Sequence, residues 1–300
     1  MCSTRCLLVC ALSGGILLAA VVGAQQNPAP GPADEPGGRS LLDRAIDSAK
    51  RNELDLDLFE RIERVELRKN PSDSQPTEVK YSRVDPVGMG LRRILLGPEG
   101  KPVNPAAYRS EVEGLAKALE WATQDGREQH DALEKFIKRK KDRLDLIEAT
   151  RTAFRYTWIA DAPRGERMLS EYRFEPNPAY KPTSRSTAIL SKIRGTVSID
   201  KSTGQVAKIQ ADVAADITIA GFLVKVYKGS HFMQERYEVE PGVWLPSFTQ
   251  YDFDGRKFII GFSVHERIFH TNYRRIGAPK EALPLIRAEL DKPGPANADP

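Results

Sequence analysis

The stretch from Gly195 to Phe253 constrains the fold of this chain more than any other part of it. Apolar and polar residues alternate there in short runs, and segments rich in Gly, Pro or Asp-Lys-Ser separate the runs. Successive side chains on a strand point to opposite faces, so this pattern is typical of half-buried antiparallel strands joined by tight turns. The stretch therefore predicts a meander of strands at the centre of the fold.

The strand pattern extends to both sides of this meander. Phe154, Tyr156 and Trp158 alternate along a predicted strand and so share one of its faces. After the meander, Asp254–Gly255 separates two alternating runs and predicts a hairpin turn, while 270–276 is expected to form a last edge strand. Together with strand candidates at 78–85 and 90–97, these patterns predict about eleven strands.

Helical patterns occupy other parts of the chain. We expect a helix from Ser40, and a passage from helix to strand within 53–69. Asn104 precedes Pro105, which is a favourable start for a long helical region 104–150, broken near Asp125–Gly126. One further short helix is expected within 280–290.

This order of elements predicts an α+β fold built on one large antiparallel sheet. Strongly twisted sheets of about eleven strands tend to curl, which would give an open half-barrel with helices covering its concave side. The predicted domain covers 40–277 and includes the helical insertion 104–150, and 278–300 is expected to be a flexible tail.

The first residues of the chain have the pattern of a secretory signal peptide. Arg5 precedes an apolar run, 7–22, and small residues at Val22–Gly23–Ala24 offer a cleavage site. The alternative is an uncleaved membrane anchor, but the run is shorter than the roughly 20 residues that a spanning helix needs. We therefore predict a signal peptide at 1–24, a Pro/Gly-rich linker at 25–39, and an exported protein of the periplasm or cell envelope that is soluble after cleavage.

Composition excludes several functional classes. The only cysteines are Cys2, Cys6 and Cys10, all within the predicted signal, so the exported chain would have no disulfide framework and no cysteine nucleophile. The 45 Lys and Arg against 41 Asp and Glu leave a net charge of +4, or 44 − 41 = +3 without Arg5. Because positive and negative charges are nearly equal in number, the net charge gives no argument for nucleic-acid binding.

Three segments together resemble a known family. They are GTVSIDKSTGQVAKI from Gly195, KGSHFMQERYEVEPGVWLP from Lys228, and the closing aromatic strand that ends in NYRR at Arg275. They resemble the LolA-like envelope proteins, and exported acidobacterial members of that group most of all. The resemblance covers 154–275 and implies an incomplete antiparallel barrel whose apolar side binds acyl chains. This chain departs from the lipoprotein carriers in its insertion 104–150 and its Pro-rich linker, and no binding residue is carried over.

The aromatic residues are the candidate ligand contacts. A half-barrel leaves part of its apolar face without a second sheet, so some rings must meet either helices or a ligand. We hypothesise that four of them line such a site: Trp158, Phe222, Trp244 and Phe262. The alternative, for each of them, is an ordinary place in a closed core.

Other candidate chemistry is sparse. The four histidines, His130, His231, His265 and His270, have no metal-site spacing, and no cofactor motif is present. Ser263 and His265 could share a strand face, but no acid partner is evident, so a hydrolase is a distant third hypothesis.

The basic run that includes Lys138, Arg139 and Lys140 is expected to be a solvated helix face, with anionic membrane headgroups as the alternative. We therefore predict a non-catalytic lipid- or lipoprotein-acyl-chain-binding protein, a carrier or a sensor. The alternative is a structural or interaction module of the envelope whose cup is filled by its own helices.

Overall fold

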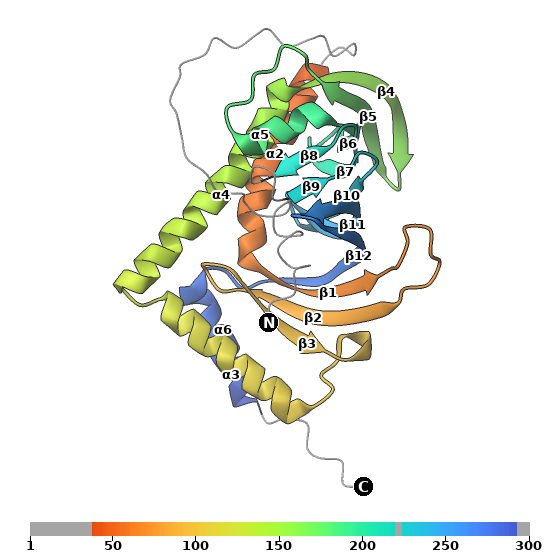
Figure 1. The fold of residues 1–300 in the computed structure, drawn as a ribbon. Helices are drawn as coiled ribbons and strands as arrows, with labels where there is room; N and C mark the ends of the chain where they lie inside the picture. Colours follow the sequence, from red (N-terminus) through yellow and green to blue (C-terminus); the bar gives the residue numbers. More distant parts are fainter. Residues whose placement is uncertain (1–37, 220–223, 293–300) are drawn as a thin grey trace. The chain divides into compact units, whose positions relative to one another are not determined.

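The computed structural model describes residues 38–219 and 224–292 (Figure 1). Its helices are α2 (Gly38–Asp55), α3 (Pro105–Ala122), α4 (Arg127–Ala153), α5 (Arg185–Ala188) and α6 (Pro279–Asp291). Short 3₁₀ turns are η1 (Leu56–Leu58), η2 (Pro98–Gly100) and η3 (Ile189–Lys192). The strands are β1 (Phe59–Leu67), β2 (Glu78–Pro86), β3 (Leu91–Leu96), β4 (Phe154–Arg164), β5 (Arg167–Pro176), β6 (Ile193–Asp200), β7 (Val206–Val213), β8 (Ile217–Ile219), β9 (Val224–Val226), β10 (His231–Glu240), β11 (Val243–Lys257) and β12 (Ile260–Arg275).

The strands of the described residues form one open sheet. Its order is β3-β2-β1-β12-β11-β10-β7-β6-β5-β4, with β8 and β9 as a side hairpin in which β9 pairs with β11. Among the described strands, β3 and β4 at the two ends do not pair with each other, so the sheet is not closed. The predicted α+β class with a large antiparallel sheet is confirmed, with twelve strands in the described part of the chain where about eleven were predicted.

The chain divides into two compact units. Of the described residues, the first unit comprises those within 38–53, 67–76 and 139–267, and the second comprises those within 54–66, 77–138 and 268–292. The predicted single domain over 40–277 stays a prediction, and each unit is described by itself below.

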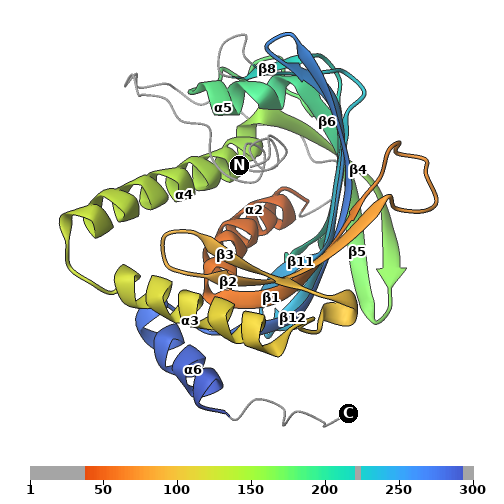
Figure 2. The same ribbon diagram turned by 60° about the horizontal axis from the view of Figure 1, so that its bottom comes forward.

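In the first unit, apolar side chains of α2 pack on the β4–β7 part of the sheet, and α2 and α5 lie on the same side of these strands (Figure 2). The alternating apolar positions of the strands supply the other half of this core. Its buried members are Leu41, Leu42, Ala45, Ala153, Phe154, Tyr172, Phe174, Leu190, Val197, Ile199 and Val206. Helix α2 thus removes one face of these strands from water, as the apolar side of its sequence predicts.

The second unit has its own core between α3, α6 and β3. It contains Ile94, Val112, Leu115, Ala116, Leu119, Ile276, Ala282 and Ile286. Helix α3 begins where the sequence predicts: the Asn104 side chain accepts hydrogen bonds from the backbone N–H groups of Ala106 and Ala107, both at 3.0 Å. The break before α4 also falls at the predicted place, between Ala122 and Arg127.

The turn after β6 shows why its motif has the sequence Asp-Lys-Ser-Thr-Gly. Asp200 Oδ1 accepts hydrogen bonds from the backbone N–H groups of Ser202 and Thr203, at 3.0 and 2.9 Å. Gly204 has φ 68°, a left-handed conformation that favours glycine. This part of the motif has a structural role.

One predicted hairpin turn is wrong in its position. β11 continues through Asp254–Gly255 to Lys257, and the chain turns at Phe258–Ile259. Gly255 lies opposite Val226 of β9, and a Cβ on it would come within 2.2 Å of the Lys225 carbonyl oxygen. The glycine therefore allows β9 to approach β11 closely, which a local turn signal cannot reveal.

Two smaller expectations are corrected as well. Residues 270–276 were expected to form an edge strand, but they belong to the end of β12, which lies between β1 and β11 in the strand order. The flexible tail expected from 278 instead includes α6, whose Ala282 and Ile286 are fully buried. The short helix expected within 280–290 is confirmed. No helix of the described part is both long and apolar enough to cross a bilayer.

Candidate functional site

The structure does not bring the four predicted ligand contacts together. Trp158 on β4 is partly exposed, whereas Trp244 on β11 is buried with Leu169 and Ala207. Phe262 on β12 is half-buried, and its ring lies beside Gly255. Phe222 lies outside the described residues. The two tryptophans therefore belong to different surroundings.

Trp244 has the contacts of a core residue. The guanidinium carbon of Arg167 lies 4.9 Å from the centre of the Trp244 ring, which is a cation–π distance. Arg167 in turn forms an ion pair with Asp200 at 3.1 Å. The backbone N–H of Trp244 donates to the Asn52 side chain of α2, at 3.1 Å. These contacts fix Trp244 and support the alternative that it is part of a closed core.

Trp158 ends a row of aromatic side chains that leads out of the core of the first unit. Phe154 is buried and its ring centre lies 4.8 Å from that of Phe174. Tyr156, the next in the row, is half-buried, and Trp158 is 38% exposed. Because Trp158 pairs directly with the buried Tyr172 of β5, it lies on the same face of the sheet as the core. The helices therefore cover the start of this apolar row and leave its end in contact with solvent.

Polar groups follow directly after the exposed end of the row. The indole Nε1–H of Trp158 donates to Asp161 Oδ1 at 3.3 Å, and the Ser170 hydroxyl donates to the same oxygen at 2.7 Å. The Lys201 ammonium lies 2.5 Å from Asp161 Oδ2. Hydrogen bonds from Lys201 and Ser170 lower the pKa of Asp161, so the carboxylate stays ionised. The row of rings thus has an apolar, covered end and a charged, exposed end.

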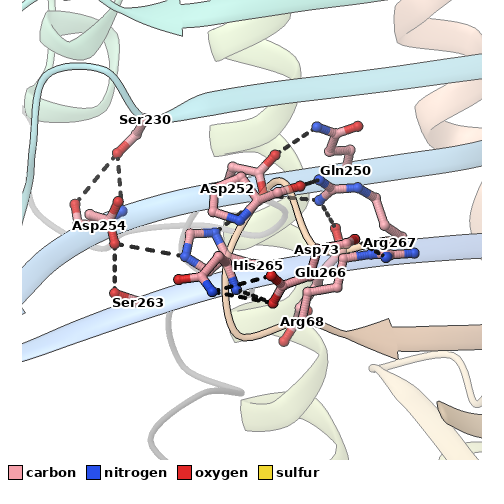
Figure 3. Close-up of polar contacts among 12 residues, drawn as sticks. Arg68, Asp73, Ser230, Gln250, Asp252, Asp254, Ser263, His265, Glu266 and Arg267 are labelled. Carbon is pink, nitrogen blue, oxygen red and sulfur yellow. Dashed lines mark hydrogen bonds and ion pairs between the residues drawn. The ribbon is translucent and has the colours of Figure 1, made fainter. Parts of the chain in front are cut away.

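Ser263 and His265 do share a face of β12, and two acids of β11 lie beside them (Figure 3). The Ser263 hydroxyl donates to Asp254 Oδ1 at 2.6 Å. His265 Nδ1 lies 3.2 Å from Asp252 Oδ1, and His265 Nε2 lies 3.9 Å from Asp254 Oδ1. The acids were missed from the sequence because a turn at Asp254–Gly255 would place Asp254 in the turn itself and would shift the strand register, so that Asp252 would not lie opposite His265.

This polar group lacks the arrangement of a hydrolase. A serine nucleophile needs a base that accepts its proton, with the acid behind that base, whereas here the serine hydroxyl bonds the carboxylate itself. Arg267 also donates to Asp252 Oδ1, at 3.0 Å. Ser263, His265 and Arg267 of β12 each contact Asp252 or Asp254 of β11, and these contacts stabilise the β11–β12 hairpin. Among the residues described, no group of His, Cys, Asp and Glu could hold a metal ion.

The basic run on α4 has the environment of a helix face. Lys138 is exposed, while Arg139 and Lys140 are half-buried and each has an interaction partner. Lys141 pairs with Asp145 one turn further on, at 2.5 Å. These observations favour the expected solvated helix face over a patch of free cations.

A buried charged cluster in the second unit was missed from the sequence. Arg83 on β2 pairs with Glu60 at 2.9 Å, with Asp85 at 2.9 Å and with Glu289 of α6 at 2.7 Å, and it donates to the Tyr108 hydroxyl of α3 at 2.8 Å. Burial raises the pKa of Asp85 to about 7, although Arg83 opposes this shift. The signal that could have found the cluster is the Arg-x-Asp spacing of β2, which places both side chains on one face of a strand.

The described strands form an open antiparallel sheet of the α+β class, partly covered by helices. The described residues contain no recognisable catalytic or metal centre. No protein-family model matches the chain, and no curated protein matches it. A search of solved structures finds a domain assigned to outer membrane lipoprotein sorting, from Vibrio parahaemolyticus.

That match covers 78% of this chain and 92% of the other, at 9% identity and a TM-score of 0.29. The matched domain is of the kind that the three sequence segments resemble. A likeness with so low a TM-score supports no conclusion about the fold or the ligand of this chain.

Proposed function

We propose that this chain is an exported protein of the cell envelope that binds an acyl chain of a lipid or lipoprotein without covalent chemistry. The observation that carries the proposal is the aromatic row of β4, which runs from buried Phe154 to exposed Trp158 on the core face of the sheet. The predicted signal peptide and the LolA-like sequence segments support the same reading.

The physical argument concerns the exposed end of the row. An acyl chain that lies against Trp158 would remove apolar surface from water on both partners, at about 0.8 kcal/mol for each buried CH₂ group. The charged pair of Asp161 and Lys201 lies just beyond and matches the polar end of an amphiphilic ligand. An apolar wall with a polar group at one end is what such a ligand requires.

Lipid extraction gives the direct test. Protein purified from the exporting cell is extracted with organic solvent, the extract is analysed by mass spectrometry, and binding of a fluorescent fatty acid is titrated. We expect a co-purified lipid and saturable binding. Protein that is free of lipid and does not bind the fatty acid would contradict the proposal.

Two tryptophan variants test whether the proposed acyl-chain site lies at Trp158. Trp158→Ala is expected to weaken fatty-acid binding about tenfold or more, because a large apolar contact is lost. Trp121→Ala is the matched control, because Trp121 on α3 is 36% exposed against 38% for Trp158. Equal affinity of the two variants would remove Trp158 from the site.

The second candidate function is a structural or interaction module of the envelope. It is favoured by the way in which α2 fills the other end of the row, where Leu41, Leu42 and Ala45 share a core with Phe154. Failure of the lipid tests together with an unchanged, stable fold would favour this alternative.

An anionic membrane surface is a further proposed partner, with Lys138, Arg139 and Lys140 as one candidate contact. Reversing these three charges would weaken binding to anionic vesicles at low salt if α4 makes that contact. The same variant serves as a comparison below.

A further inference from the structure

The tip of the β11–β12 hairpin exposes three consecutive large apolar residues. Phe258 is 53% exposed, Ile259 is 92% exposed and Ile260 is 72% exposed. Consecutive residues at a turn project together from the end of a hairpin, so these side chains form one protrusion within the first unit. Single exposed apolar residues are ordinary, whereas a contiguous group of this size indicates an interaction site.

The backbone of this tip is also unusual. Phe258 has φ 55°, a left-handed conformation that glycine or asparagine adopts easily and a bulky aromatic residue does not. An Asp-Gly pair suited to a turn lies only a few residues earlier, within β11, yet the chain turns at an aromatic residue instead. Pairing with β9 explains where the turn falls, but neither this pairing nor local conformational preference requires bulky apolar residues at the turn, whereas a binding role does.

Basic residues stand immediately behind the apolar protrusion. Arg256 and Lys257 precede Phe258, and neither forms an ion pair or side-chain hydrogen bond with another residue of the described part. Arg256 lies directly opposite Lys225 of β9, whose charge is paired with Asp216 at 2.7 Å. The hairpin thus carries, at the base of its apolar tip, two cations that have no charge partner within the described residues.

We propose that this hairpin tip docks the protein on an anionic lipid bilayer. Phe258, Ile259 and Ile260 insert among the acyl chains at the membrane surface, and Arg256 and Lys257 contact the anionic headgroups. An apolar edge followed by cations matches the two layers of a bilayer surface, hydrocarbon and anionic headgroup, in the order in which a protrusion meets them. An anionic bilayer offers both layers over its whole surface, whereas a partner protein would need an apolar groove with acidic side chains at its rim. The inference does not depend on acyl-chain binding near Trp158.

The test is flotation of the full chain, purified from the exporting cell, with two kinds of vesicle. One kind contains phosphatidylcholine in which one third of the lipid is replaced by phosphatidylglycerol, and the other contains phosphatidylcholine alone. Wild-type protein is expected to float with the anionic vesicles and to bind the neutral ones at least fivefold less, since each surface cation contributes roughly a fivefold factor.

Two variants separate the apolar and the charged parts of the tip. Ile259→Ser combined with Ile260→Ser is expected to lower vesicle binding about tenfold or more on both kinds of vesicle. Arg256→Glu combined with Lys257→Glu is expected to lower binding to the anionic vesicles at low salt, and to leave the weak binding to neutral vesicles unchanged. The circular dichroism spectrum and the fatty-acid affinity of both variants should equal those of the wild type, because the altered side chains lie outside the cores.

A matched control variant tests whether any pair of exposed apolar residues would support binding to vesicles. Leu95 and Val103 of the second unit are 73% and 79% exposed, and Leu95→Ser with Val103→Ser should leave flotation unchanged. Flotation that persists in the tip variants would overturn the proposal. So would a wild-type protein that ignores both vesicles, or a loss produced only by charge reversal at Lys138, Arg139 and Lys140.

Discussion

At the scale of single residues, Gly195 shows how one position can fix two strands. A Cβ built on it would lie 1.9 Å from the Gln210 carbonyl oxygen of β7 and 2.9 Å from the ring of Phe174. The backbone of β7 and an aromatic ring of the core therefore occupy the space that any other side chain would need. This accounts for a glycine at the start of the β6 motif, where no turn requires one.

Gly195→Ala is expected to lower the free energy of unfolding by about 1–3 kcal/mol, as overpacking of a closed core does. Chemical denaturation measures this. Gly90→Ala is the control, since a Cβ on Gly90 meets no atom within 4 Å, and its effect should stay within about 0.5 kcal/mol. Equal effects of the two substitutions would show that the close approach is not tight in solution.

Asp85 gives the protein a pH dependence with a definite sign. Its pKa is raised to about 7 in the folded state, chiefly by burial, against about 3.9 in an unfolded chain. Between these values the native protein holds a proton that the unfolded chain has released. The stabilisation from this carboxyl group is therefore complete below about pH 4 and is lost as the pH rises to about 7.

Asp85→Asn removes this titration. The free energy of unfolding of the wild type minus that of the variant is expected to fall by about 1–3 kcal/mol between pH 5 and pH 8. Urea denaturation at a series of pH values measures the difference. A difference for Asp85→Asn that stays flat or rises would contradict the raised pKa.

At the scale of elements, α6 belongs to the folded core of the second unit. Ile286 is fully buried between α3 and β3, and Glu289 on the same helix pairs with the buried Arg83. The helix begins with Pro279 and has a capping contact, in which Glu281 accepts from the backbone N–H of Ala278 at 3.0 Å. Packing and an ion pair both hold it in place.

Ile286→Ala is expected to destabilise the protein by about 2–5 kcal/mol through the cavity it leaves. Leu285→Ala, at the neighbouring exposed position, should change stability by less than about 1 kcal/mol. Thermal denaturation followed by circular dichroism measures both. If the two variants melted together, α6 would not be docked as the structure places it.

The β11–β12 hairpin shows at this scale where local sequence signals fail. Asp254–Gly255 has the composition of a tight turn, but β9 needs the glycine for close approach, and the strand continues past it. The consequence is large, because the shifted turn brings Asp252 and Asp254 beside His265 and leaves an apolar tip at Phe258–Ile260. Only the pairing with a third strand decides the position of this turn.

At the scale of the whole molecule, the described strands form an open sheet, and the two units have separate cores. An open sheet must have its apolar face covered by helices, by a ligand or by a membrane. Helices α2, α3 and α6 account for the two cores. The proposals on Trp158 and on the hairpin tip concern the apolar side chains that these helices leave exposed.

The sequence alone determined the elements and the class of fold. Period-two alternation predicted most strands, Asn104 and Pro105 predicted the start of α3, and the order of elements predicted an antiparallel α+β sheet. These features depend on neighbours in the chain, whose geometry a pattern records directly. The candidate contacts were predicted less well, because residue type does not distinguish a core ring such as Trp244 from an exposed one such as Trp158.

Only the tertiary structure decided which side chains meet. The Arg83 cluster joins β1, β2, α3 and α6, and its members are as far apart in the chain as Glu60 and Glu289. The role of Gly255 in β11 likewise depends on a distant segment, because the carbonyl oxygen of Lys225 in β9 lies close to it. Such contacts follow from strand pairing and packing between distant segments, whose energies no local pattern contains, and they determine where apolar surface stays exposed.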